Sequence, residues 1–141
     1  MITSAIQRLE QYIAEKPSHF RLLDESELEF KPTLEKWSKK EIFGHLIDSA
    51  TNNLTRFISG QFEDNPIILY DQDHWCKHNY YQVADFSQMI VLWESLNRQL
   101  VFIWKQLSSE ALQRKANDHT LSFLAEDYVS HLEHHLNQIA E

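Results

Sequence analysis

Hydrophobic residues recur at intervals of three and four positions in four stretches of this chain, and this spacing is typical of helices buried on one face. The pattern predicts helices over residues 3–14, 39–59 and 86–107, and a last helix that runs from residue 120 to the end. Pro17 is expected to stop the first helix, because proline removes a backbone hydrogen bond. Glycine and proline are scarce, which favours helix over sheet. The prediction is an all-α fold in one domain spanning residues 1–141.

The predicted helix ends rest on capping signals. Ser38 is followed three residues later by Glu41, which is the pattern of a capping box, and Gly60 marks the far end of the same helix. Asp85 is placed to cap the third helix, and Ser108 to cap a short further turn.

A connection of 24 residues, 61–84, separates the second and third helices and shows no periodicity. Connections longer than roughly 12–15 residues are uncommon in compact domains and are often functional. Two interpretations stay open: a lid or wall of a cleft, and a crossover that covers the core.

Composition excludes several classes of function. The net charge of −8 and the lack of a basic patch argue against nucleic-acid binding and against anionic membranes. No apolar run approaches the roughly 20 residues that span a bilayer. A single cysteine, Cys76, cannot form an intramolecular disulfide, which fits a reducing compartment. We therefore expect a cytoplasmic protein.

Two of the eight histidines have the spacing of a metal-binding pair. His131 and His135 are four residues apart on the last predicted helix, so one ion could bind both imidazoles. His134 falls outside the apolar stripe of this helix, with Asp127 and Ser130, so we assign the second ligand to His135. The alternative is a pair of histidines at the edge of the core.

The third ligand is expected to be His45, the other histidine inside a clearly predicted helix. It lies opposite the apolar stripe of that helix, in a polar column with Glu41, Asp48, Ser49, Asn52 and Arg56. This column is either a solvated face or the wall of a polar cleft against the last helix, and periodicity does not decide between them.

The residues around these histidines resemble the DinB/YfiT-like superfamily. Residues 37–50, followed by Asn52, Asn53, Arg56 and Phe57, resemble its second helix, and residues 121–139 resemble its last helix. The connection with Tyr70, Gln72 and Trp75 is also similar. The resemblance implies a four-helix bundle in up-down-down-up order and a homodimer. It also implies a three-histidine metal site, which here would be His45, His131 and His135.

The resemblance also implies a function. Some relatives are thiol-dependent transferases or isomerases, so we expect a divalent-metal enzyme acting on small electrophilic substrates, with a low-molecular-weight thiol as co-substrate. Zinc is the default metal, and nickel or iron would also suit three imidazoles. The alternative is a non-catalytic protein that binds a metal or small ligand, and a third interpretation is a structural dimer with solvated histidines.

Asp48, Arg56 and Asp127 are the candidate catalytic residues. Asp48 is three residues after His45 and Asp127 four before His131, so each carboxylate could reach an imidazole or a substrate. Arg56 could bind an anionic group. Ordinary surface positions are the alternative for all three.

Overall fold

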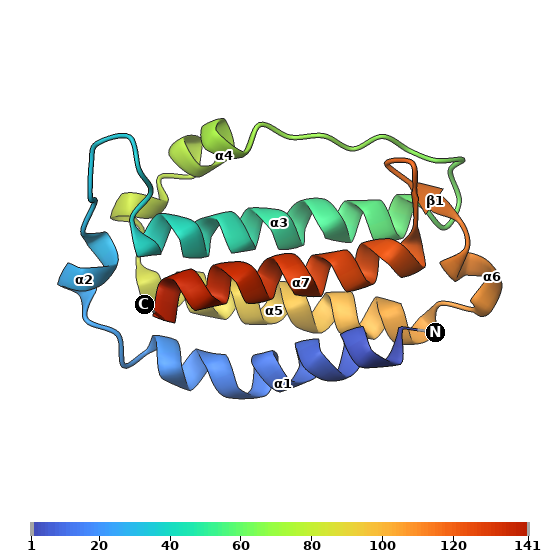
Figure 1. Cartoon of the computed structure of the whole chain (residues 1–141), viewed down its shortest axis with the longest axis horizontal. Helices are drawn as coiled ribbons and strands as arrows, with labels where there is room; N and C mark the ends of the chain where they lie inside the picture. The colour runs from blue at the N-terminus through green and yellow to red at the C-terminus, as the bar shows by residue number, and fades with distance from the viewer. Residues whose placement is uncertain (1, 141) are drawn as a thin grey trace.

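Four long helices run side by side in the structure, a computed structural model that describes residues 2–140 (Figure 1). They are α1 (Thr3–Phe20), α3 (Lys39–Ser59), α5 (Phe86–Gln106) and α7 (Leu121–Ala140). Helices α1 and α7 run in one direction and α3 and α5 in the other (Figure 1). The predicted all-α four-helix bundle with up-down-down-up order is confirmed. Among residues 2–140, no helix combines the length and apolar character needed to cross a membrane.

Because α3 and α5 run in the same direction, the chain must return along the bundle between them. This connection passes over α3 and carries α4 (Gln72–His78) and a 3-10 turn, η1 (Tyr81–Val83) (Figure 1). The lack of periodicity in residues 61–84 gave no prediction of either element. Asp71 supplies the missing signal, since its side chain accepts a 3.0 Å hydrogen bond from the backbone N–H of His74 and caps α4.

The predicted caps are confirmed. Ser38 Oγ accepts a hydrogen bond from the N–H of Glu41, and Glu41 Oε1 accepts one from the N–H of Ser38, both at 3.1 Å. Asp85 caps α5 through the N–H of Ser87, and Ser108 caps the short helix α6 (Ser109–Leu112). Another short helix, α2 (Glu25–Glu29), lies between α1 and α3.

The expectation that Pro17 stops the first helix is wrong. Helix α1 continues through Pro17 to Phe20, although the proline cannot donate to the carbonyl of Ile13. Phe20 is buried in this last turn and packs edge-on against Phe43 and Trp93, with ring centroids 4.8 and 5.6 Å apart. The free energy gained by burying this large aromatic ring is greater than the cost of the one missing backbone hydrogen bond, so the turn is stable.

A small hairpin leads into α7. Strands β1 (Lys115–Ala116) and β2 (His119–Thr120) pair antiparallel across a turn at Asn117 and Asp118. Both turn residues have positive φ, 52° and 67°, as a two-residue hairpin turn of this hand requires. The Asn117 amide exchanges two 2.9 Å hydrogen bonds with the backbone of Ile68. These bonds attach the connection between α3 and α5 (residues 61–84, the crossing connection) to the hairpin.

Candidate metal centre

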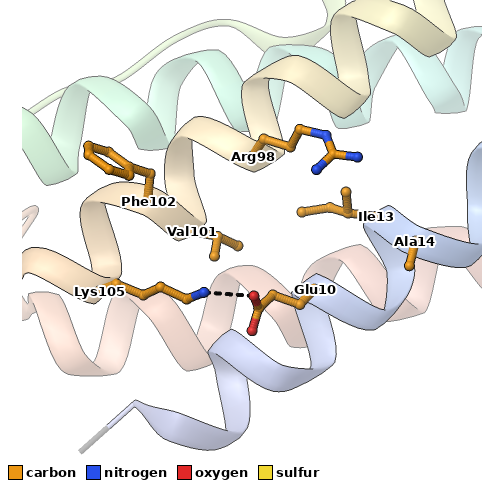
Figure 2. Close-up of a pocket in the computed structure, with 7 residues that line it drawn as sticks. All are labelled: Glu10, Ile13, Ala14, Arg98, Val101, Phe102 and Lys105. Atoms are coloured by element: carbon orange, nitrogen blue, oxygen red, sulfur yellow. Dashed lines mark hydrogen bonds and ion pairs between the residues drawn. The ribbon is translucent and has the colours of Figure 1, made fainter.

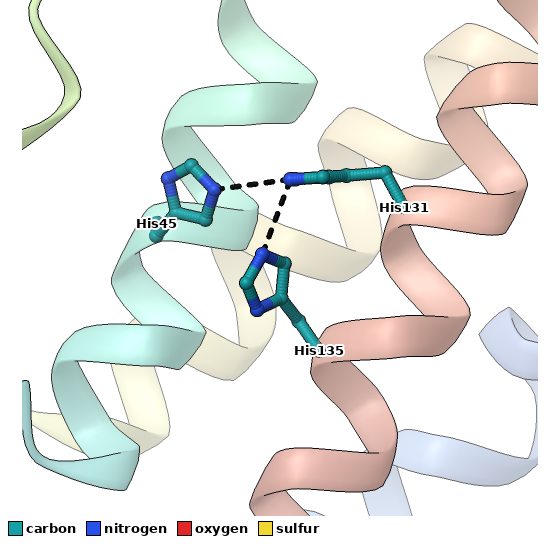
Figure 3. A group of neighbouring side chains, drawn as sticks. All are labelled: His45, His131 and His135. Carbon is teal, nitrogen blue, oxygen red and sulfur yellow. Dashed lines mark hydrogen bonds between the residues drawn. The ribbon is translucent and has the colours of Figure 1, made fainter.

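The three predicted ligands meet between α3 and α7. His45 extends from α3, and His131 and His135 extend from α7 toward it (Figure 3). Nε2 of His131 lies 3.2 Å from Nε2 of His45 and 3.1 Å from Nε2 of His135. One nitrogen from each ring lies within 4.8 Å of the other two. The geometry therefore brings together the residues that the sequence selected.

These separations fit a shared divalent ion. Zinc binds histidine nitrogen at about 2.0–2.1 Å, so two ligands in tetrahedral geometry lie about 3.3 Å apart. The Nε2 separations of 3.2 and 3.1 Å agree with that value. Three imidazoles leave at least one coordination position for water or substrate, which is the arrangement of a catalytic rather than a structural metal site.

Burial keeps two of the three imidazoles, His45 and His131, in the form that binds a metal. It lowers the pKa of His45 and of His131 to about 4, because a desolvated imidazolium is unfavourable. The neighbouring histidines lower both pKa values further, while Asp127 acts in the opposite direction on His131. Near pH 7 both rings are neutral and keep a lone pair for an ion.

Neighbouring side chains hold two of the three candidate ligands, His135 and His45, in place. The Nδ1–H of His135 donates a 2.7 Å hydrogen bond to Oε1 of Gln138, which leaves Nε2 of that ring as the metal-binding atom. Gln138 was not among the predicted site residues, although its i,i+3 spacing from His135 was a usable signal. The ring of Trp37 lies against His45, with centroids 5.1 Å apart.

The polar column on α3 is buried, so its interpretation as a solvated face is wrong. His45, Asp48, Ser49 and Asn52 are at most 6% exposed. The crossing connection covers them, since Tyr81 and Asn79 donate to Oδ1 of Asp48 at 2.6 and 3.1 Å. Nδ1 of His45 and Oδ2 of Asp48 are buried without a hydrogen-bond partner among residues 2–140.

A cleft of about 140 Å³ opens beside the histidines. Its lining comes from α3, α7 and the crossing connection: His45, Ser49, Asn53, Arg56, Tyr70, Gln72, Leu124, Asp127, Tyr128 and His131. Two candidate residues, Arg56 and Asp127, therefore face the cleft. Asp48 does not line it and bonds to the crossing connection instead. The connection is thus both a cover for α3 and a wall of the cleft.

A second hollow, of about 290 Å³, lies between α1 and α5 (Figure 2). Lys105 and Glu10 form a 2.7 Å ion pair across it, and Val101 and Ile13 contribute apolar walls. It contains none of the three histidines and no residue of the cleft. The histidine cluster is therefore the stronger candidate for the functional site.

Comparisons with known proteins show which proteins this chain is similar to. The chain is 26% identical to "Putative metal-dependent hydrolase YfiT" of Bacillus subtilis (strain 168), over 96% of this chain and 80% of that protein. It is 27% identical to a "Putative metal-dependent hydrolase" of Bacillus cereus (strain AH820), over 83% of this chain and 68% of the other.

The fold is similar to a solved structure of YfiT from Bacillus subtilis, described as "a probable metal-dependent hydrolase with an unusual four-helix bundle topology". The two structures superpose with a TM-score of 0.87 at 25% identity, over 97% of this chain and 82% of the other. The DinB superfamily profile matches residues 8–139, nearly the whole length. This chain belongs to the DinB superfamily.

Proposed function

We propose that this chain is a metal-dependent hydrolase whose divalent ion is held by His45, His131 and His135. The observation that carries the proposal is the meeting of three Nε2 atoms, with 3.2 and 3.1 Å between neighbours, in a cluster where burial keeps His45 and His131 neutral. The names of the relatives from Bacillus subtilis and Bacillus cereus support the same class of reaction.

A divalent ion in this position would act as a Lewis acid and lower the pKa of a coordinated water toward 7. The chain supplies the rest of the site. Gln138 orients His135, and the cleft beside His45 and His131 receives a small substrate. Asp127 lies on the wall of this cleft, one turn before His131. We assign its carboxylate as the general base that would accept a proton from the water that attacks the substrate.

Thiol transfer, which the family resemblance implied, has less support than hydrolysis. An ion held by three imidazoles could equally lower the pKa of a bound thiol, but the names of the relatives indicate hydrolysis. The metal is proposed to be zinc, with nickel and iron as alternatives that suit the same ligands.

Turnover assays test the proposal. Wild-type protein loaded with zinc, nickel or iron is given a panel of small esters and amides, with and without glutathione, bacillithiol or mycothiol. We expect hydrolysis that needs no thiol, is lost in His131→Ala and is kept in His134→Ala, since His134 is exposed outside the cluster. Turnover that requires a thiol would favour a transferase. Turnover unchanged by His131→Ala would refute the site.

A further inference from the structure

Arg56 is a half-buried cation whose protein partners are all neutral. Its Nε and Nη2 donate to the carbonyl oxygen of Ile68 at 3.2 and 2.8 Å, and its Nη1 donates to Oδ1 of Asn53 at 3.4 Å. It forms no ion pair with any residue in the range 2–140. A guanidinium has five N–H groups, so these contacts leave two of them free for another acceptor.

This environment is unfavourable for an isolated charge. Burial lowers the pKa of Arg56, which shows that desolvation opposes its charged form, while Tyr70 and Asp127 act in the opposite direction. Asp127 is exposed and lies beyond ion-pair distance, so it compensates the charge only in part. A guanidinium removed from water is best stabilised by a bidentate oxyanion, and neutral carbonyl oxygens are weaker acceptors.

The charge of Arg56 also faces the space in which a substrate would bind. Arg56 lines the same cleft as His45 and His131. Tyr70 and Gln72 line it too, and their side chains form no hydrogen bond with another described residue, so both can donate to a ligand. The volume of about 140 Å³ is well below the roughly 300–1,000 Å³ of pockets for drug-sized ligands, which limits the ligand to a small molecule.

We propose that Arg56 is an anion-binding residue of the cleft and that the substrate is a small molecule with a carboxylate at the end remote from the three histidines. The part of this inference that concerns the reacting end of the substrate rests on the proposed function. The anion subsite itself rests on the free N–H groups of Arg56 and on its place in the cleft.

Arg56 also holds the crossing connection through Ile68, so its loss could act through the fold alone. Arg114 offers a matched control, because it anchors the same connection from outside the cleft. Its Nε donates to the carbonyl of Gly60 at 2.9 Å and its Nη2 to the carbonyl of Glu63 at 3.1 Å. Arg114→Gln should loosen the connection while leaving the anion subsite intact.

Calorimetric titration tests the subsite. The probes are malonate, succinate and glutarate, each compared with its own monoamide, on metal-free and zinc-loaded wild type, Arg56→Gln, Arg56→Lys and Arg114→Gln. We expect at least one dicarboxylate to bind zinc-loaded wild type and Arg114→Gln about tenfold more tightly than its monoamide. This preference should disappear in Arg56→Gln and be reduced in Arg56→Lys, which keeps the charge without the planar fork.

If Arg56→Gln preferred the dicarboxylate over its monoamide as strongly as wild type does, the anion subsite would be refuted. It would also be refuted if wild type showed no such preference. Zinc content, measured on the same samples, separates this result from a failure of the proposed function. If wild type took up no zinc, the hydrolase proposal would fail. Dicarboxylate binding to the metal-free protein that depended on Arg56 would still support the subsite.

Discussion

The hydroxyl of Tyr81 donates a 2.6 Å hydrogen bond to Oδ1 of Asp48, and the ring reaches this buried carboxylate by lying directly against Gly44. A Cβ atom at position 44 would come within 2.2 Å of Cδ2 of Tyr81. Gly44 is next to His45 in the sequence, so this contact joins the crossing connection to α3 beside the candidate metal centre.

Gly44→Ala is expected to destabilise the protein, although alanine is the better helix former. The added methyl group cannot fit beside Tyr81, so the ring must move and its hydrogen bond to Asp48 is strained or lost. We expect a cost of about 1–3 kcal/mol in urea-induced unfolding.

A double-mutant cycle with Tyr81→Ala checks the cause. Without the ring, Gly44→Ala should become neutral or stabilising by up to about 1 kcal/mol, because only helix propensity remains. An equal cost in both backgrounds would show that the penalty does not come from Tyr81.

Asp48 should give the protein a distinctive pH dependence. Burial raises the pKa of this carboxyl to about 6, and the bond from Tyr81 offsets the shift only in part. In the unfolded chain the carboxyl of Asp48 ionises near pH 4, whereas in the folded protein it stays protonated up to about pH 6. The free energy of unfolding therefore falls as pH rises from about 4 to 6. Asp48→Asn lacks this loss.

The stability of Asp48→Asn relative to wild type should therefore increase across that range, by an amount on the order of 3 kcal/mol, and stay level above pH 6. Urea unfolding of metal-free protein at several pH values measures the difference, in which any constant effect of the substitution cancels. A difference that does not vary with pH would contradict the buried position of the ionised carboxylate.

His45, which is buried, and His131, which is half-buried, should act in the opposite direction to Asp48. The pKa values of His45 and His131 are lowered to about 4, so the unfolded chain binds protons first as the solution is acidified. Metal-free protein should lose stability from these groups as pH falls from about 6.5 to 4. His131→Asn should be less sensitive to acid over this window than wild type. Equal acid sensitivity in His131→Asn and wild type would argue against burial of this ring in its neutral form.

The helices could be read from the sequence where local chemistry fixes them. The capping box at Ser38 and Glu41 depends only on neighbouring residues, and α3 begins and ends where it was predicted. Pro17 misled the prediction because burial of Phe20, a tertiary effect, keeps the helix intact beyond the proline. Helix α4 was missed because it has only seven residues, too few to show a period.

At the candidate site, too, the features set by local sequence could be predicted and those set by tertiary packing could not. The spacing of His131 and His135 follows from one helix, and so does the exclusion of His134. The burial of His45 could not be read from its own helix. It depends on α7 and on the crossing connection, which covers the column through Asn79 and Tyr81. Periodicity shows which residues share a face, and it does not show what packs against that face.

Elemental analysis of protein purified without a metal-chelating tag tests the central claim most directly. Wild type is compared with His45→Ala and His131→Ala, and His134→Ala is the matched control from the same helix as His131. The three-histidine centre predicts about one equivalent of zinc, nickel or iron in wild type and His134→Ala, and little in the other two variants. A wild type that neither contains nor takes up metal, or equal metal in all four proteins, would contradict it.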